Sequence, residues 1–188
     1  MDILYKLPTD LNHIINISIW LFLILAVVIS KKSPTVRWIA LCILIARTID
    51  IVIYPWALTT GTWFYVIVSM QDLLLALVIL FRYKITYTIA NKNLWSISKL
   101  AKHCHCDFRL TSNEIMYVLI LFSSILVNIA SLIERGIRKL TDYNPMFIYN
   151  SFESMKWLLT LLSVMVIFSL TIDAVRGLYT GKKIRNYT

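Results

Sequence analysis

Five long apolar segments limit what this 188-residue sequence can fold into. Each approaches the roughly 20 residues that an α-helix needs to cross a bilayer. Hydrophobic side chains make up 59% of the chain and charged side chains only 15%, a balance unlike that of a soluble domain. The sequence therefore predicts an all-α fold: a polytopic integral membrane helical bundle with five transmembrane helices, at residues 11–30, 36–58, 63–81, 115–133 and 157–175.

The first of these helices is the weakest, because polar residues occupy its opening turns. If it does not span, the alternative is four crossings with both chain ends inside. In either case we expect a single membrane domain over residues 1–188, with a cytoplasmic loop at 83–112 and an external loop at 134–156.

Helix-start signals support these boundaries. A capping residue can accept a hydrogen bond from an early backbone N–H, and Pro is tolerated at the first helical position. The predicted caps are Ser33 followed by Pro34, Thr111 followed by Glu114, and Asn150 followed by Glu153. Only TTGT, residues 59–62, joins the second and third helices, which predicts a tight antiparallel hairpin.

The distribution of basic residues predicts the orientation. Segments 31–37, 82–109 and 176–185 contain 13 of the 19 Lys and Arg residues. The positive-inside rule then places the N-terminus outside and the C-terminus in the cytoplasm of a multi-pass cell membrane, the inner membrane if the source is bacterial. The net charge of +9 fits topology determinants and contacts with an anionic inner leaflet, so no direct nucleic-acid binding is expected.

An intramembrane charge cluster is the most unusual feature. Asp50 and Asp72 each lie 11 residues from Gly61, about 16 Å from the turn at 1.5 Å per residue and therefore near the bilayer centre. Arg47 lies one turn deeper, within reach of either acid. Tyr54 and Ser69 extend the two facing stripes on the second and third helices.

Two interpretations of this cluster remain open. Each unpaired ion at mid-helix costs roughly 2.5 to 3.5 kcal/mol, so the three charges must face protein or water. They can form a structural lock that fixes helix register or joins subunits. They can also form an ion path, a proton-responsive gate or a sensor.

A second polar face follows the fourth helix at Ser124, Asn128 and Ser131, spaced i, i+4, i+7. Small and amide side chains at this spacing are typical of close helix packing in membranes, and lining of a pore is the second interpretation.

The cytoplasmic segment contains a predicted amphipathic helix between the third and fourth spans. Apolar side chains share one face, while Lys92, Trp95, Lys99 and Lys102 provide positive charge and an aromatic anchor. This pattern indicates contact with the inner leaflet or with a cytosolic protein partner.

The run HCHC, His103, Cys104, His105 and Cys106, is the one metal-like motif. In an extended chain its side chains alternate, so one chain would offer two ligands at a time and a tetrahedral zinc would need a second subunit or a partner. Exposed, reduced cysteines on a loop are the default expectation.

No enzyme motif is present, and we expect neither catalysis nor a cofactor. The preferred hypothesis is a small self-associating membrane protein, a homo-oligomer that acts as a membrane sensor or channel-like component with a cytosolic partner. The alternative is a non-conducting membrane anchor or accessory subunit of a larger complex, such as a bacterial stress or anti-phage system used in antiviral defence.

Overall fold

The computed structural model describes residues 9–30, 33–92, 95–106, 111–141 and 144–176. Within these ranges the regular secondary structure is entirely helical, as the sequence predicts. The elements are α1 (Thr9–Ile29), α2 (Pro34–Thr59), α3 (Trp63–Leu80), α4 (Arg82–Asn91), α5 (Trp95–Cys106), α6 (Ser112–Leu140) and α7 (Phe147–Val175).

Three of these helices are long and apolar enough to cross a membrane: α3, α6 and residues Phe147–Asp173 of α7. The apolar part of α1, Ile17–Ile29, is shorter. The helical membrane architecture is thus supported, while the count of five spans stays a prediction.

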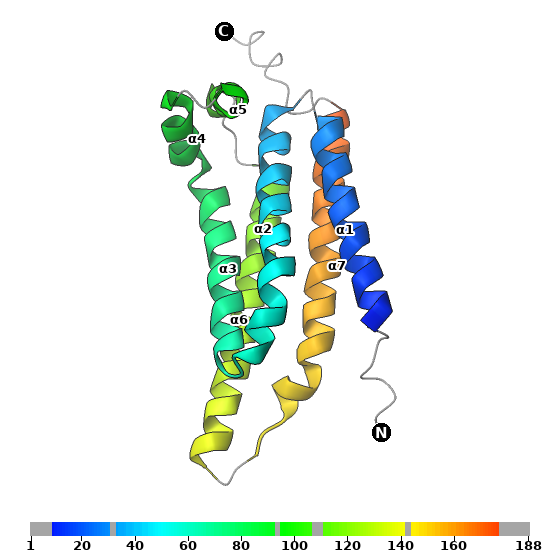
Figure 1. Cartoon of the computed structure of the whole chain (residues 1–188), viewed down its shortest axis with the longest axis vertical. Coiled ribbons are helices and arrows are strands. Elements are labelled where there is room, and N and C mark those ends of the chain that lie inside the picture. Colours follow the sequence, from blue (N-terminus) through cyan, green and yellow to red (C-terminus); the bar gives the residue numbers. More distant parts are fainter. Residues whose placement is uncertain (1–8, 31–32, 93–94, 107–110, 142–143, 177–188) are drawn as a thin grey trace.

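The five long helices form a bundle in which each packs against its neighbours (Figure 1). The packing order is α1, α2, α3, α6 and α7, and α7 returns to contact both α1 and α2. The short helices α4 and α5 lie at one end of the bundle, and the connection between α6 and α7 lies at the other (Figure 1). We refer to these as the α4–α5 end and the α6–α7 loop end.

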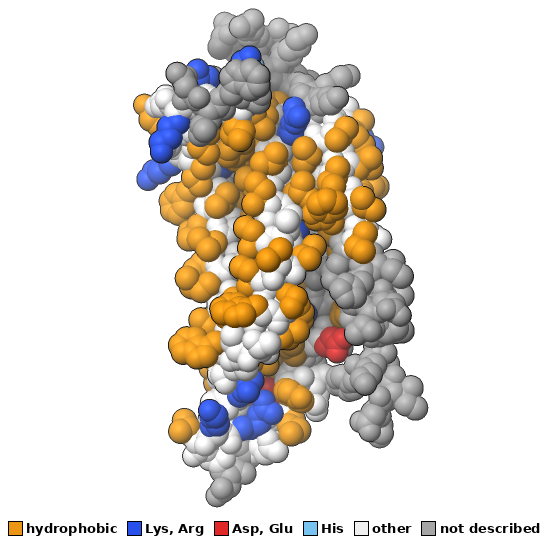
Figure 2. Space-filling model, viewed as in Figure 1, with side chains coloured by type: hydrophobic (Ala, Val, Ile, Leu, Met, Phe, Trp, Pro, Cys, Tyr) orange, Lys and Arg blue, Asp and Glu red, His pale blue; other side chains and the backbone are white. Residues whose placement is uncertain are grey.

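The apolar core occupies the half of the bundle nearer the α4–α5 end. It draws on the first part of α2 and α6 and on the last part of α3 and α7, because these helices run antiparallel. Among its buried members are Ile43, Ile79, Val118, Leu121, Ile167 and Leu170. On the outer surface, apolar side chains cover the middle of the visible face and basic side chains gather mostly near its two ends (Figure 2), as expected of a bilayer-spanning bundle.

The connection between α6 and α7 is much shorter than the predicted external loop at 134–156. Both helices extend into that range and leave only residues 141–146 between them. Asn150 consequently lies inside α7 and does not cap it. Glu134 of α6 performs that role instead, since its carboxylate accepts hydrogen bonds from the backbone N–H groups of Ile148 (3.3 Å) and Tyr149 (2.8 Å).

The other predicted helix starts are met in part. Ser33 occupies the N-cap position of α2 with Pro34 next, but its side chain makes no capping hydrogen bond. Thr111 accepts a hydrogen bond from the backbone N–H of Glu114 at 3.3 Å, as predicted. Gly61 has φ +64°, a conformation that glycine adopts readily, and it closes the α2–α3 hairpin.

The predicted cytoplasmic loop at 83–112 contains two helices, α4 and α5. The buried side chains of Ala101 and Cys104 on α5 pack with Trp38 of α2 and Ala90 of α4. The hydroxyl of Ser98 also donates to the Ala90 carbonyl at 3.0 Å. The α4–α5 hairpin is therefore fastened to α2 by side chains of this chain itself.

Candidate functional site

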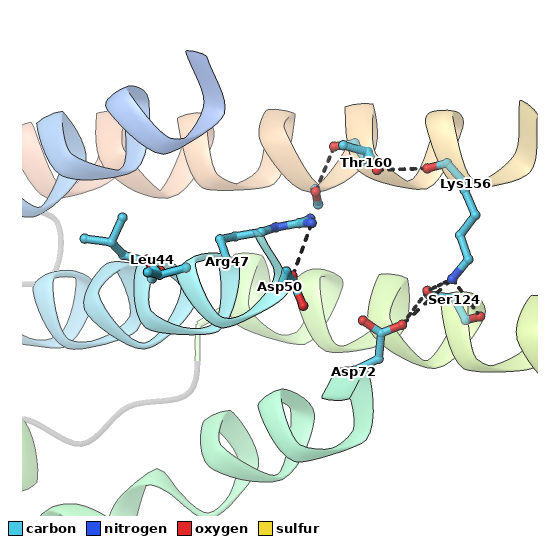
Figure 3. A network of polar contacts seen from close by, with 9 residues as sticks. Leu44, Arg47, Asp50, Asp72, Ser124, Lys156 and Thr160 are labelled. Atoms are coloured by element: carbon cyan, nitrogen blue, oxygen red, sulfur yellow. Dashed lines mark hydrogen bonds and ion pairs between the residues drawn. The ribbon is translucent and has the colours of Figure 1, made fainter. Parts of the chain in front are cut away.

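Two groups of charged side chains lie at the middle of the bundle, where sequence depth places the charge cluster (Figure 3). The first is an ion pair within α2, between the Arg47 guanidinium and the Asp50 carboxylate, whose closest atoms are 3.6 Å apart. About a third of each side chain remains exposed, 34% and 35%. The pair is therefore only partly enclosed by this chain.

The second group joins three helices. The hydroxyl of Ser124 on α6 donates to the Asp72 carboxylate on α3 at 2.6 Å and accepts from the Lys156 ammonium on α7 at 2.6 Å. Lys156 also lies 4.0 Å from the same carboxylate oxygen of Asp72. Asp72, Ser124 and Lys156 are called the ion triad below, and the triad together with Arg47 and Asp50 is called the charged layer.

This arrangement differs from the predicted one in the partner of Asp72. From the sequence, Arg47 is expected within reach of both acids and Lys156 is expected in the external loop. The structure instead pairs Arg47 with Asp50 and provides Lys156 for Asp72, because α7 begins at Phe147, before the predicted cap at Asn150 and ten residues before the predicted membrane span at 157.

The two remaining members of the predicted cluster lie apart from the ion pairs. The ring of Tyr54 packs edge-to-face against Phe64, with centroids 5.7 Å apart, and Ser69 is half-buried on α3. From Phe64 the ring contacts continue to Tyr65 and then to Phe152, at 5.5 and 5.4 Å. These four rings form an aromatic layer across α2, α3 and α7.

The charged layer lies between two unlike surroundings. On each of α2, α3 and α7 the aromatic layer lies toward the α6–α7 loop end, and the apolar core lies toward the α4–α5 end. The Lys156 ammonium also approaches the Phe152 ring at 5.7 Å, a cation–π distance. Full charges are thus held at mid-bundle between an aromatic boundary and an apolar one.

The predicted polar face of α6 is buried. Ser124, Asn128 and Ser131 are at most 8% exposed. They lie on a helix that packs against both α3 and α7. Ser124 belongs to the ion triad, and the hydroxyl of Ser131 donates to the carbonyl of Val127 at 2.9 Å. The face therefore lies in the interfaces between helices. Both interpretations, close helix packing and lining of a polar path, place such residues there.

A buried ion pair outside the predicted cluster joins the α3–α4 junction to α6. The Arg82 guanidinium and the Glu114 carboxylate lie 2.9 Å apart, and their side chains are 1% and 0% exposed. From the sequence, Arg82 is one of the cytoplasmic bases and Glu114 the second half of a capping box. The sequence gives no local sign of this pair, because its two residues are 32 positions apart and are brought together only by the packing of the helices.

The basic residues predicted to contact the inner leaflet or a partner are on the surface. Lys92, Lys99 and Lys102 are exposed, and the Trp95 side chain lies outside the described residues. Because Ala101 and Cys104 of α5 face α2 and α4, the described side chains on its exposed face are Ile97, Lys99, Lys102 and His103.

The HCHC run forms the last turn of α5 and is not extended, so the expected alternation of ligands is wrong. The Nδ1 atom of His103 lies 2.7 Å from the Lys99 carbonyl oxygen, to which it donates a hydrogen bond when it carries the ring proton. Cys104 is fully buried, contrary to the expected exposure, and His105 packs against Tyr83 with ring centroids 4.4 Å apart. The Cys106 side chain lies outside the described residues. Within the described part of the chain, no three His, Cys, Asp or Glu side chains are placed to hold a metal ion.

The ion triad has one geometric feature in common with a nucleophile and its base. Ser124 and Lys156 are 2.6 Å apart, within hydrogen-bond reach. The hydroxyl proton of Ser124, however, is donated to Asp72, and Ser124 lies in the middle of a helix whose backbone N–H groups bond within the helix. This geometry favours stable holding of opposite charges.

Comparison with protein families, with curated proteins and with solved structures finds no match for this chain.

Proposed function

We propose that this chain is a small self-associating membrane protein that acts as a membrane sensor or channel-like component, with the charged layer as its responsive element. The observation that carries the proposal is the residual exposure of four charged side chains at mid-bundle: 34% and 35% for Arg47 and Asp50, and 23% and 22% for Lys156 and Asp72. Charges at this depth are costly against acyl chains. Their exposed parts require water or another protein chain.

The surroundings of the charged layer suggest how a response could be produced. The apolar core lies on its α4–α5 side and closes the bundle interior with side chains such as Ile43, Leu121 and Ile167. Apolar constrictions of this kind block ions by excluding water, and they conduct when their walls separate. The conformation described here corresponds to the closed state in this proposal.

The middle of the bundle and its α4–α5 end suggest two kinds of partner. A second copy of the chain at the middle would cover the partly exposed Arg47–Asp50 pair. At the α4–α5 end, exposed Lys92, Lys99 and Lys102 fit anionic lipid headgroups or an acidic surface of a cytosolic protein.

The test is conductance of purified protein in planar bilayers, with mass measurement of the same sample in lipid nanodiscs. The expected result is an oligomer whose current appears under membrane tension or voltage and is altered by Asp72→Asn but not by Ser123→Ala, an exposed neighbour of the triad. A monomer, or a protein that passes no ions under either stimulus and whose Asp72→Asn variant only loses assembly, would contradict the proposal.

One observation favours the alternative of a non-conducting anchor. The α4–α5 hairpin is held on α2 by Trp38, Ala101 and Cys104, and the buried Arg82–Glu114 pair joins its base to α6. A fixed platform with an exposed basic face suits an accessory subunit that presents a soluble partner at the membrane. The conductance experiment separates the two functions.

A further inference from the structure

Asn128 is an exception within the polar face of α6. Its side chain is completely buried, and neither its amide nitrogen nor its carbonyl oxygen has a hydrogen-bond partner among the described residues. Polar neighbours on both sides along the same helix are bonded: Ser124 in the ion triad, Ser131 to Val127, and Glu134 to the start of α7. The unpaired amide therefore interrupts an otherwise bonded polar line.

The position of Asn128 follows from two fixed contacts between α6 and α7. Ser124 bonds to Lys156, and ten residues along α6, Glu134 bonds to Tyr149. Because the helices are antiparallel, Asn128 lies at the level of Phe152, whose ring contacts Tyr65 of α3. Asn128 is thus located at the level of the aromatic layer, one helical turn along α6 from Ser124 of the ion triad.

A buried amide with two donors and two acceptor lone pairs is unfavourable unless it is satisfied, and buried water commonly fills that role. We infer that Asn128 binds water in the interface of α3, α6 and α7, next to the ion triad. This inference rests on the proposed function: the bound water connects the responsive charges with solvent at the α6–α7 loop end.

The charges nearby favour water over an ion. A cation at Asn128 would lie one helical turn from the Lys156 contact on Ser124, and an anion would lie equally close to Asp72. The paired charges of the triad leave no net charge to neutralise. A neutral molecule that both donates and accepts matches the two free atoms of the amide.

X-ray radiolytic footprinting of the full chain in lipid nanodiscs tests the inference, because bound water generates hydroxyl radicals beside it. The variant is Asn128→Leu, which keeps the size of the side chain and removes its hydrogen bonds, and the matched control is Ile129→Leu on the exposed face of α6. We expect modification of Tyr65 and Phe152 to fall severalfold in Asn128→Leu and to stay unchanged in the control. Exposed Tyr83 should be unaffected in both variants. Equal modification of Tyr65 and Phe152 in Asn128→Leu and wild type would overturn the inference.

A second measurement on the wild-type protein covers the case in which Asn128→Leu fails to fold. After rapid mixing with ¹⁸O-labelled water, oxygen incorporated at Tyr65 and Phe152 should acquire the label later than at Tyr83, because bound water exchanges slowly. Simultaneous labelling at all three residues would refute a bound-water site. If the labelling delay is observed but the protein passes no current, the proposed function is rejected and the water site stands. If the protein passes current but shows no labelling delay, the water site is rejected and the proposed function stands.

Discussion

The ammonium group of Lys156 lies 4.0 Å from the carboxylate of Asp72, and the hydroxyl of Ser124 is bonded to both. One serine thereby links α3, α6 and α7 at the middle of the bundle. Because the three side chains come from different helices, movement of any one helix must stretch or break a charge-assisted hydrogen bond. This relationship couples the positions of the three helices to one another.

Replacement of Ser124 by Ala should destabilise the protein by about 1.5 to 3 kcal/mol, the usual range for hydrogen bonds to charged groups. Ser123→Ala is the matched control: its side chain is exposed, and its hydroxyl donates to the Leu119 carbonyl of its own helix. Unfolding of both variants in mixed detergent micelles gives the comparison. Equal stability of the two variants would show that the triad contributes little.

Removal of one partner of the Arg82–Glu114 pair should be severe. Arg82→Gln or Glu114→Gln leaves a buried charge without its counter-ion, at a cost of about 3 to 5 kcal/mol. The double variant Arg82→Met with Glu114→Leu should recover most of that loss. Lys84→Gln, an exposed position on the same helix, serves as the control and should leave the unfolding midpoint close to that of wild type.

Glu134→Gln should loosen the start of α7, because the replaced carboxylate carries the charge that two backbone N–H groups and the helix dipole favour. We expect a loss of about 0.5 to 2 kcal/mol, typical of a helix cap. Hydrogen–deuterium exchange should accelerate at Ile148 and Tyr149, with Glu153→Gln in the same helix as the comparison. Unchanged exchange at these two amides would mean that Glu134 does not cap α7.

The helical class and the equal distances of Asp50 and Asp72 from the hairpin turn were predictable because both depend on local patterns. Long apolar runs give helices, and counting from Gly61 gives the depth of Asp50 and Asp72. The α5 helix was likewise predictable from its periodicity, although its packing against α2 was not.

Partners across helices were harder to predict, because they depend on where each helix begins. Because the residues just before Trp157 are mostly polar, the predicted membrane span starts after Lys156. This lysine was therefore expected outside the bundle, and Arg47 was expected to be the base nearest to Asp72. The i, i+4, i+7 spacing of Lys156, Thr160 and Ser163 on one face was a usable sign. The capping of α7 by Glu134 could not be predicted from the sequence, since it joins residues of two different helices.

The predicted orientation can be tested with single cysteines in a cysteine-free background. With the N-terminus outside, Asn144→Cys in the α6–α7 connection should react with a membrane-impermeant maleimide on intact cells. Lys99→Cys on exposed α5 should react only after permeabilisation. The reverse pattern of labelling would invert the topology.

The central claim is that Asp72 and Lys156 face each other inside the membrane-embedded bundle. Exchange of their charges tests it most directly, through the unfolding free energy in lipid nanodiscs of Asp72→Lys, of Lys156→Asp and of the double variant. Each single variant places like charges together and should lose about 3 to 5 kcal/mol or more, while the double variant should regain most of the loss because the pair is restored. A double variant as unstable as the sum of the two single variants would contradict the account.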